Sequence, residues 1–364
     1  MQKESFIKKY GLLIGTGLAV GIAAVLLTKL GNPANMGFCI ACFLRDIAGA
    51  LNFQRAGFDA EVGTGIVQYI RPEIIGLVVG AFAIALLKKD FSPRGGSSPM
   101  LRFVLGFGVM VGALIFLGCP LRMAIRLGGG DLNAVVGLLG FIAGILLGIF
   151  FLKKGFTLGR SYKQGKAEGA ALTVAHVGLL VLLVAAPAFI FFSTEGPASM
   201  KAPLLIALAA GLIVGAIAQR TRLCMVGGIR DVVLFKDWTL LSGFLAIIAL
   251  VLIGNLILGK FKLGFAEQAV AHTQHLWNFL GLTAVGLGSV LLGGCPMRQL
   301  ILSGEGNTDS AMAVLGMLVG AAFCHNFGLA SSGAGTTPAG RIACIITLAV
   351  MIIIGVCNSK WKKA

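Results

Sequence analysis

Charged residues are scarce in this chain of 364 residues. Only 12% of them are Asp, Glu, Lys or Arg, against about 25% in an ordinary soluble domain. Histidine is rarer still, with four residues. The low charge excludes a soluble enzyme or binding domain, whose surface is rich in charged residues. The shortage of histidine argues against a zinc site, which usually combines cysteine and histidine ligands.

Apolar residues and glycine fill the chain instead. Hydrophobic residues make up 57% of it, glycine accounts for 53 positions, and the mean hydropathy is +0.94. A membrane-spanning helix needs about 20 mainly apolar residues. We therefore predict an all-α polytopic membrane protein with about ten transmembrane helices. The predicted spans are 10–30, 72–87, 100–118, 132–152, 172–193, 202–219, 239–258, 276–294, 309–329 and 339–357.

The charges that are present are mostly basic. The chain has 30 Lys and Arg against 14 Asp and Glu, a net charge of +16. With the N-terminus inside, ten spans place most of the basic residues in the cytoplasm, as the positive-inside rule expects. We predict a multi-pass protein of the bacterial inner membrane with both termini cytoplasmic. The basic excess also favours contact with anionic lipid, and no basic stripe with interleaved aromatic residues indicates nucleic-acid binding.

Two parts of the sequence repeat each other. Cys39-Ile-Ala-Cys-Phe-Leu-Arg45-Asp46 aligns with Cys224-Met-Val-Gly-Gly-Ile-Arg230-Asp231, and Gly118-Cys119-Pro120-Leu121-Arg122 aligns with Gly294-Cys295-Pro296-Met297-Arg298. Glycines match as well: Gly17 and Gly21 with Gly211 and Gly215, and Gly140 with Gly316. The matches occur in the same order in both copies, which indicates an internal duplication.

The number of spans gives the duplication a direction. Because an odd number of spans separates the copies, the second copy is inverted relative to the first, as in many transporters. We predict a first membrane repeat in 1–155, a connecting segment with an extra transmembrane helix in 156–200, and a second, inverted repeat in 201–330. Residues 331–364 then form a C-terminal transmembrane helix and a basic tail.

Four short segments are predicted to enter the membrane without crossing it. They are 36–51, 223–235 and the segments that follow Cys119 and Cys295, where proline suits a first helical turn. The N-terminus of such a half-helix carries partial positive charge and free N–H groups, which suit an anion. Asp131 and Asp309, near the glycine-rich turns that follow, are predicted helix caps.

Cysteine and arginine recur together at the matched positions. We predict that Cys39, Cys119, Cys224 and Cys295 line a substrate path with Arg122 and Arg298. Each of these two arginines lies three residues beyond a cysteine with no adjacent acid, so that thiol and guanidinium share one helix face. Arg45 and Arg230 are predicted to be structural and neutralised by Asp46 and Asp231, and Pro120 and Pro296 to be supporting. Cys324, Cys344 and Cys357 have no repeat partner and are expected to pack as small apolar side chains.

Other uses of the cysteines are open at this point. Cys39 and Cys42 have the spacing of a redox pair, so a membrane thiol–disulfide oxidoreductase is the alternative function, although Gly227 replaces the second cysteine in the other copy. A disulfide framework, a zinc site and a scaffold whose cysteines only pack are further alternatives. We expect no metal and no cofactor.

These motifs resemble the YeeE/YedE family of sulfur-compound transporters, and more narrowly its YedE branch, which is associated with selenium metabolism. The resemblance implies an hourglass-shaped inner-membrane protein, not an enzyme, with inverted repeats and central short helices. It implies a small anionic substrate, thiosulfate-like or a selenium compound, that passes along Cys39, Cys119, Cys224 and Cys295. It also implies a small cytoplasmic sulfurtransferase as a partner. Whether the protein is a channel or a coupled carrier stays open.

Overall fold

The structure, a computed structural model, describes residues 6–54 and 67–360. Helices form nearly all of its regular structure, and a small antiparallel pair of strands, β1 (Arg94–Gly95) and β2 (Tyr162–Lys163), joins two loops. The predicted all-α polytopic membrane protein is confirmed. The long helices are α1 (Phe6–Lys29), α3 (Pro72–Leu87), α4 (Pro99–Phe116), α6 (Asn133–Lys153), α7 (Lys166–Ala185), α9 (Leu204–Thr221), α11 (Thr239–Ile257), α12 (His275–Leu292), α14 (Thr308–Asn326) and α15 (Pro338–Cys357).

All ten predicted spans are helices, but they are not equally long. Within the described residues, nine helical stretches are long and apolar enough to cross a membrane, and α3, with 16 residues, is shorter. At about 1.5 Å per residue α3 covers roughly 24 Å, less than the roughly 30 Å of the hydrocarbon core. α7 also ends earlier than predicted, at Ala185, because Pro187 follows it closely and cannot continue a helix.

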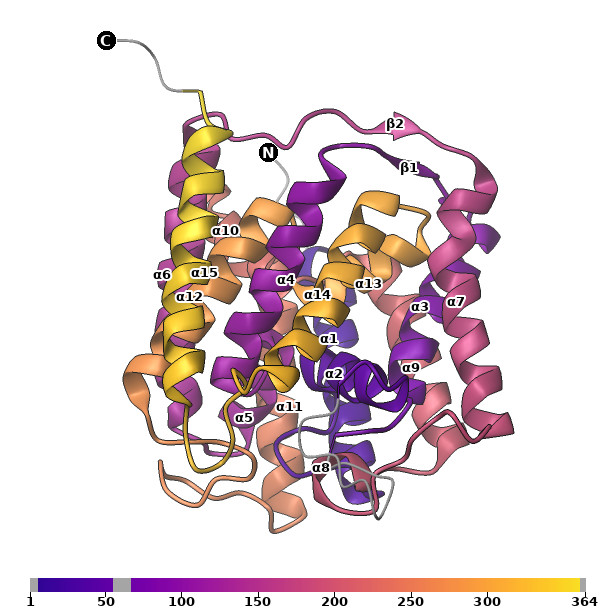
Figure 1. The fold of residues 1–364 in the computed structure, drawn as a ribbon, viewed down its shortest axis with the longest axis vertical. Coiled ribbons are helices and arrows are strands. Elements are labelled where there is room, and N and C mark those ends of the chain that lie inside the picture. Colours follow the sequence, from indigo (N-terminus) through magenta and orange to yellow (C-terminus); the bar gives the residue numbers. More distant parts are fainter. Residues whose placement is uncertain (1–5, 55–66, 361–364) are drawn as a thin grey trace.

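The four predicted short segments are separate short helices. They are α2 (Ile40–Ala50), α5 (Pro120–Gly128), α10 (Met225–Phe235) and α13 (Pro296–Gly304); a further short helix, α8 (Gly196–Ser199), lies between the two halves of the chain. Pro120 and Pro296 occupy the first turn of their helices, as predicted. In Figure 1, α2 and α5 lie in the lower half of the molecule, and α10 and α13 lie in the upper half. The two pairs of half-helices thus lie toward opposite ends of the long helices.

The long helices of one half pack mainly against those of the other half. α12 packs along α6, and α4, which has the place of α12 in the first half, packs along α14. In the same way α9 packs along α3, and α1 packs along α11. Corresponding helices of the two halves thus pack against each other reciprocally, as expected for two copies related by a twofold axis. The last long helices differ, because α7 packs on α3 and α13 whereas α15 packs on α4 and α12.

Glycines that match in the sequence make matching contacts. A Cβ atom at Gly140 would overlap the carbonyl oxygen of Phe279, and one at Gly316 would overlap that of Phe103. Because both glycines lack a Cβ, α6 approaches α12, and α14 approaches α4, with backbone against backbone. Such close approach through small residues is typical of helix pairs in membranes.

The two predicted aspartate caps differ in the structure. Asp131 lies one residue before Leu132, the N-cap of α6, and accepts a hydrogen bond from the backbone N–H of Asn133, the first residue of α6 (2.9 Å). The prediction for Asp309 is wrong, because Asn307 caps α14 by accepting from the N–H of Ser310. Asp309 instead accepts from the N–H groups of Gly96 and Ser97 in the first half of the chain.

Candidate functional site: paired half-helix termini that begin on cysteine

Each of the four half-helices begins directly after one of the four matched cysteines. Cys39, Cys119, Cys224 and Cys295 are the N-caps of α2, α5, α10 and α13, and all four are in extended backbone conformation. The Cys39 sulfur accepts from the N–H of Cys42 (3.3 Å), and the Cys224 sulfur accepts from the N–H of Gly227 (3.4 Å). The sulfur atoms therefore lie where the free N–H groups of a helix terminus point.

The cysteines meet in two pairs, one in each half of the chain. The thiols of Cys39 and Cys119 lie close to each other, and so do those of Cys224 and Cys295. The N–H of Cys295 also points at the Cys224 sulfur, 3.4 Å away. Within the described residues no hydrogen bond joins one pair to the other. Two half-helix N-termini thus converge on each thiol pair.

The thiol pairs have different sulfur neighbours. Cys42 contacts the first pair, because its backbone N–H donates to the Cys39 sulfur. The second pair has a thioether in its place: the Cys295 thiol lies 3.8 Å from the sulfur of Met225. The repeat comparison gave no role to Met225 and treated Cys42 as an addition of the first copy. In the sequence, the spacing between Cys39 and Cys42 was the feature that could have predicted that Cys42 lies beside the first thiol pair.

Arg122 lies at the first thiol pair and is fully buried. Its guanidinium donates to the carbonyl oxygens of Asn35 and Val270, both at 2.9 Å, and to the Cys42 sulfur at 3.2 Å. It therefore faces the thiol of the neighbouring half-helix and not Cys119, whose face it was predicted to share. No carboxylate among the described residues lies within ion-pair distance of it. A buried cation without a counterion is unfavourable.

Arg298, the counterpart of Arg122, has a different partner. It donates to the carboxylate of Glu305 at 2.9 Å, in an ion pair that is largely buried. No acid is adjacent to Arg298 in the sequence, but the end of α13 brings the carboxylate of Glu305, seven residues away, back to the guanidinium. The two copies differ in charge at the matched position, since the Arg122 site is positive and the Arg298 site is neutral.

The Arg-Asp pairs form ion pairs in both copies. Arg45 binds Asp46 at 2.7 Å in a buried site, and Arg230 binds Asp231 at 2.8 Å in a partly exposed one. Asp46 also binds Arg71 at 2.7 Å, and Arg71 donates to carbonyl oxygens of the segment around α8. Sequence comparison missed Arg71, because the second copy has no matching arginine. These contacts fit the structural role predicted for Arg45 and Arg230.

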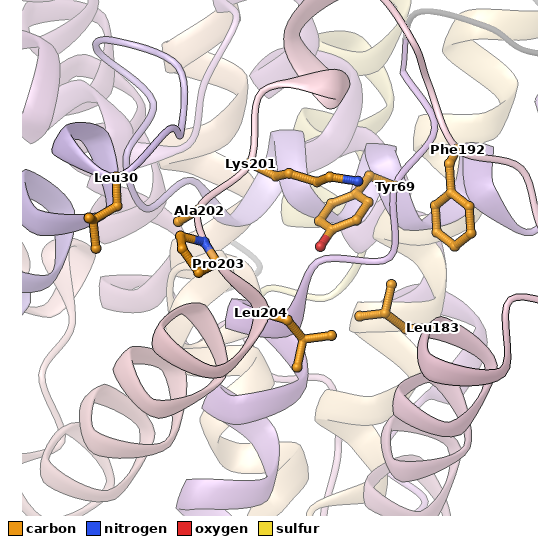
Figure 2. Close-up of a pocket in the computed structure, with 8 residues that line it drawn as sticks. All are labelled: Leu30, Tyr69, Leu183, Phe192, Lys201, Ala202, Pro203 and Leu204. Atoms are coloured by element: carbon orange, nitrogen blue, oxygen red, sulfur yellow. The ribbon is translucent and has the colours of Figure 1, made fainter.

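A cavity of about 480 Å³ lies beside Arg71, between the end of α7 and the start of α9. Figure 2 shows Lys201 lying across the ring of Tyr69 and pointing toward Phe192. The Lys201 ammonium is 4.7 Å from the centre of the Tyr69 ring, and the Arg71 guanidinium is 5.2 Å from it. Burial raises the pKa of Tyr69 to about 12, so this phenol stays neutral. The cavity is lined by none of the four path cysteines.

The structure favours neither a disulfide framework nor a metal centre. All eight cysteines of the chain lie among the described residues, and all are free thiols. Those residues also contain no cluster of three or more His, Cys, Asp or Glu side chains that could hold a metal ion.

The fold and the paired termini together define a polytopic α-helical membrane protein whose interior holds two thiol sites. Residues 220–358, which include α10 to α15, match the profile of a family described as Sulphur transport. The chain is 34% identical over 108 residues to the "Thiosulfate transporter TsuA" of Spirochaeta thermophila, which is 30% of this chain and 32% of the relative. It is 28% identical over 120 residues to the "Thiosulfate transporter TsuA" of Escherichia coli K12, which is 33% of this chain and 34% of the relative.

These matches agree with the resemblance drawn from the motifs: residues 220–358 match a sulphur-transport family, and about a third of the chain is similar to two thiosulfate transporters. The chain spans about a third of the length of the curated relatives it matches. Both relatives carry the names of transporters, in agreement with the prediction that the chain is not an enzyme. Neither name refers to selenium, so the narrower YedE branch stays a prediction.

Proposed function

We propose that the chain transports a small, soft, sulfur-containing anion of the thiosulfate type across the membrane. The observation that carries the proposal is Arg122, a fully buried guanidinium that has carbonyl and thiol partners but no carboxylate partner among the described residues. A buried charge of this kind is stabilised when an opposite charge binds beside it. An anion at Arg122 supplies that charge.

The thiols beside Arg122 favour a soft atom over a hard oxygen. Sulfur is polarizable, and a thiol is a weak hydrogen-bond donor. Cys39 and Cys119 can therefore contact the terminal sulfur of a thiosulfate-like anion while Arg122 binds its oxygens. In this proposal Cys224 and Cys295, with Arg298 nearby, receive the ion at the opposite end. A selenium compound with a soft terminal atom fits the same chemistry.

Two further parts of the proposal concern the cell. We place the protein in the bacterial inner membrane, with membrane lipid around its exposed apolar side chains. A small cytoplasmic sulfurtransferase that accepts the delivered sulfur is the proposed partner. Pull-down of soluble proteins with the purified chain, followed by a sulfurtransferase assay, tests the partner separately from transport.

Uptake by proteoliposomes tests the proposal directly. We expect labelled thiosulfate to enter, and selenite and sulfate to compete only weakly, because the terminal atoms of both are hard oxygens. Cys119→Ala and Cys295→Ala should each reduce uptake at least tenfold, whereas Cys357→Ala, an exposed cysteine outside both pairs, should not. A tenfold loss corresponds to about 1.4 kcal/mol. Full uptake by both alanine variants contradicts the thiol path.

The contact between Cys39 and Cys42 supports one alternative, a membrane thiol–disulfide oxidoreductase. This activity requires Cys42 and passes through a Cys39–Cys42 disulfide. Mild oxidation, thiol alkylation and mass measurement detect that disulfide. If Cys42→Ser keeps thiosulfate uptake within about twofold and no disulfide is trapped, the oxidoreductase hypothesis is rejected.

A further inference from the structure

Glu73, in the first turn of α3, is a buried acid with no cationic partner. It is 1% exposed. Its Oε1 accepts from the side-chain amide of Asn32 at 2.8 Å, and its Oε2 has no hydrogen-bond partner. The other buried acids of the described residues are ion-paired: Asp46 with Arg45 and Arg71, Asp131 with Arg126, and Asp309 with Arg102. No cation of residues 6–54 and 67–360 lies within ion-pair distance of Glu73.

Glu73 and Arg122 hold the same segment of the chain, residues 32–37. Asn32 begins this segment, and its amide donates both to Glu73 and to the carbonyl oxygen of Gly37. The carbonyl oxygen of Asn35, in the middle of the segment, accepts from Arg122. The segment then leads into Cys39, the N-cap of α2. Glu73 and Arg122, neither of which has a partner of opposite charge among the described residues, thus contact the same short loop beside the first thiol pair.

The charged and titratable groups near Glu73 are already paired or neutral. Arg71 and Asp46 are the charges that act on it, and they bind each other. Tyr69, on the preceding loop, stays neutral because burial raises its pKa to about 12. A carboxylate oxygen that is buried without a donor is unfavourable. Proton binding removes the charge of Glu73 and keeps the hydrogen bond from Asn32.

We propose that Glu73 binds a proton that enters with the anion, so that the protein is a proton–anion symporter. The inference rests on the proposed function. An anion at Arg122 adds negative charge to a loop that Glu73 also contacts. A proton on Glu73 offsets that charge, so each ligand increases the affinity for the other, as linkage requires. The proton leaves again when the anion moves on and the positive charge of Arg122 is no longer offset by the anion.

Proteoliposomes with a pH gradient test this symport. The membrane potential is clamped at zero with potassium and valinomycin, and thiosulfate accumulation is measured with and without an inside-alkaline gradient of one pH unit. One coupled proton raises the accumulation ratio about tenfold, because one pH unit is a tenfold difference in proton activity. Glu73→Gln keeps the shape of the side chain but cannot bind a proton. We expect it to transport thiosulfate down its gradient with no response to pH.

Glu195→Gln is the matched control, because Glu195 is an exposed acid next to α8 and should leave the tenfold response intact. A wild-type protein that transports thiosulfate with no response to the gradient overturns the symport alone. A full response in Glu73→Gln overturns the role of Glu73. Absence of any thiosulfate uptake overturns the proposed function as well.

A measurement on the wild type needs no variant and covers the case in which Glu73→Gln does not fold. Thiosulfate is added to the purified protein in weakly buffered detergent solution with a pH indicator, and sulfate is added in a parallel sample. We expect the protein to take up about one proton for each thiosulfate bound, and sulfate to give a smaller signal. Thiosulfate binding without proton uptake overturns the inference.

Discussion

At the scale of single residues, Arg122 and Arg298 show how two copies of one motif acquire different roles. The motif is the same in both, yet only Arg298 has an acid, Glu305, in reach. The positive charge of Arg122 is therefore available to a ligand, whereas that of Arg298 is already offset. In the proposed function, we therefore expect Arg122 to contribute more to substrate binding than Arg298 does.

Arg122→Gln should weaken substrate binding more than Arg298→Gln does. A hydrogen bond to a charged group contributes about 1.5–3 kcal/mol, so we expect the KM for thiosulfate uptake to rise about 10- to 100-fold in Arg122→Gln. Because Glu305 already neutralises Arg298, its variant should raise KM no more than about threefold. Initial uptake rates over a range of thiosulfate concentrations give both values. Equal changes in the two variants contradict the assignment.

His272, in the loop between α11 and α12, makes stability depend on pH. Its Nε2 donates to the carbonyl oxygen of Ile115 (2.8 Å), and its Nδ1 accepts from the N–H of Gln274 (3.3 Å), a pattern that requires the neutral ring. Burial, with a smaller contribution from Arg126, lowers its pKa below the usual 6.5. The unfolded chain therefore binds more protons than the folded one between these two pKa values.

Stability from His272 is full above about pH 6.5 and is lost as the pH falls toward the lowered pKa, by up to about 1.4 kcal/mol per pH unit. We expect the melting temperature in detergent to fall between pH 7.5 and pH 5.5. His272→Gln, whose amide can make both hydrogen bonds without a charge, should show a smaller fall over the same range. If the two proteins lose stability in parallel, the titrating group is not His272.

At the scale of elements, the cysteine-capped half-helices were predictable, and the reason is local. Proline after Cys119 and Cys295 and the glycines before them mark a helix start in the sequence itself. Arg71, Glu73 and Asn32 were not found, because they meet only through tertiary contacts and the second copy contains no equivalents. The partners of Arg122 were also hidden, since the backbone carbonyl groups of Asn35 and Val270 leave no signature in the sequence.

The matched glycines allow a test of the helix pairs. Gly140→Ala and Gly316→Ala place a Cβ against the carbonyl oxygens of Phe279 and Phe103, so α6 must move away from α12, and α14 from α4. Overpacking of this kind typically costs about 1–3 kcal/mol, and we expect similar losses of stability for the two variants. Gly178→Ala in α7, where no atom lies within 4 Å, is the control and should be neutral or slightly stabilising. Thermal melting of the three variants measures the difference; two unaffected melting temperatures contradict the close contacts.

At the scale of the whole molecule, ion pairs and backbone contacts place the start of α1 and the end of α15 on one side. Near the start of α1, Lys9 pairs with Asp237, between α10 and α11. Arg220, at the end of α9, pairs with Asp90, after α3. The N–H of Lys360, past α15, donates to the carbonyl oxygen of Lys154, and Figure 1 shows α15 ending at the upper face beside the loop that carries β2. With ten spans, an even number, the start of α1 and the end of α15 must lie on the same side of the membrane.

This side also carries most of the basic residues, for example Lys88, Lys89, Lys163 and Lys166, so the positive-inside rule predicts that it is cytoplasmic. Fluorescent-protein fusions at either terminus should therefore fluoresce in the cytoplasm, whereas alkaline phosphatase should be active when inserted in loops of the opposite side, such as 186–203 or 258–274. Cysteine substitutions on a cysteine-free background, at Lys163 on one side and Lys262 on the other, give an independent measure with an impermeant thiol reagent. Labelling of Lys262→Cys but not of Lys163→Cys in intact cells supports the orientation. The reverse result contradicts it and places the Arg122 site at the cytoplasmic end of the protein. Anion and proton would then reach Arg122 and Glu73 from the cytoplasm.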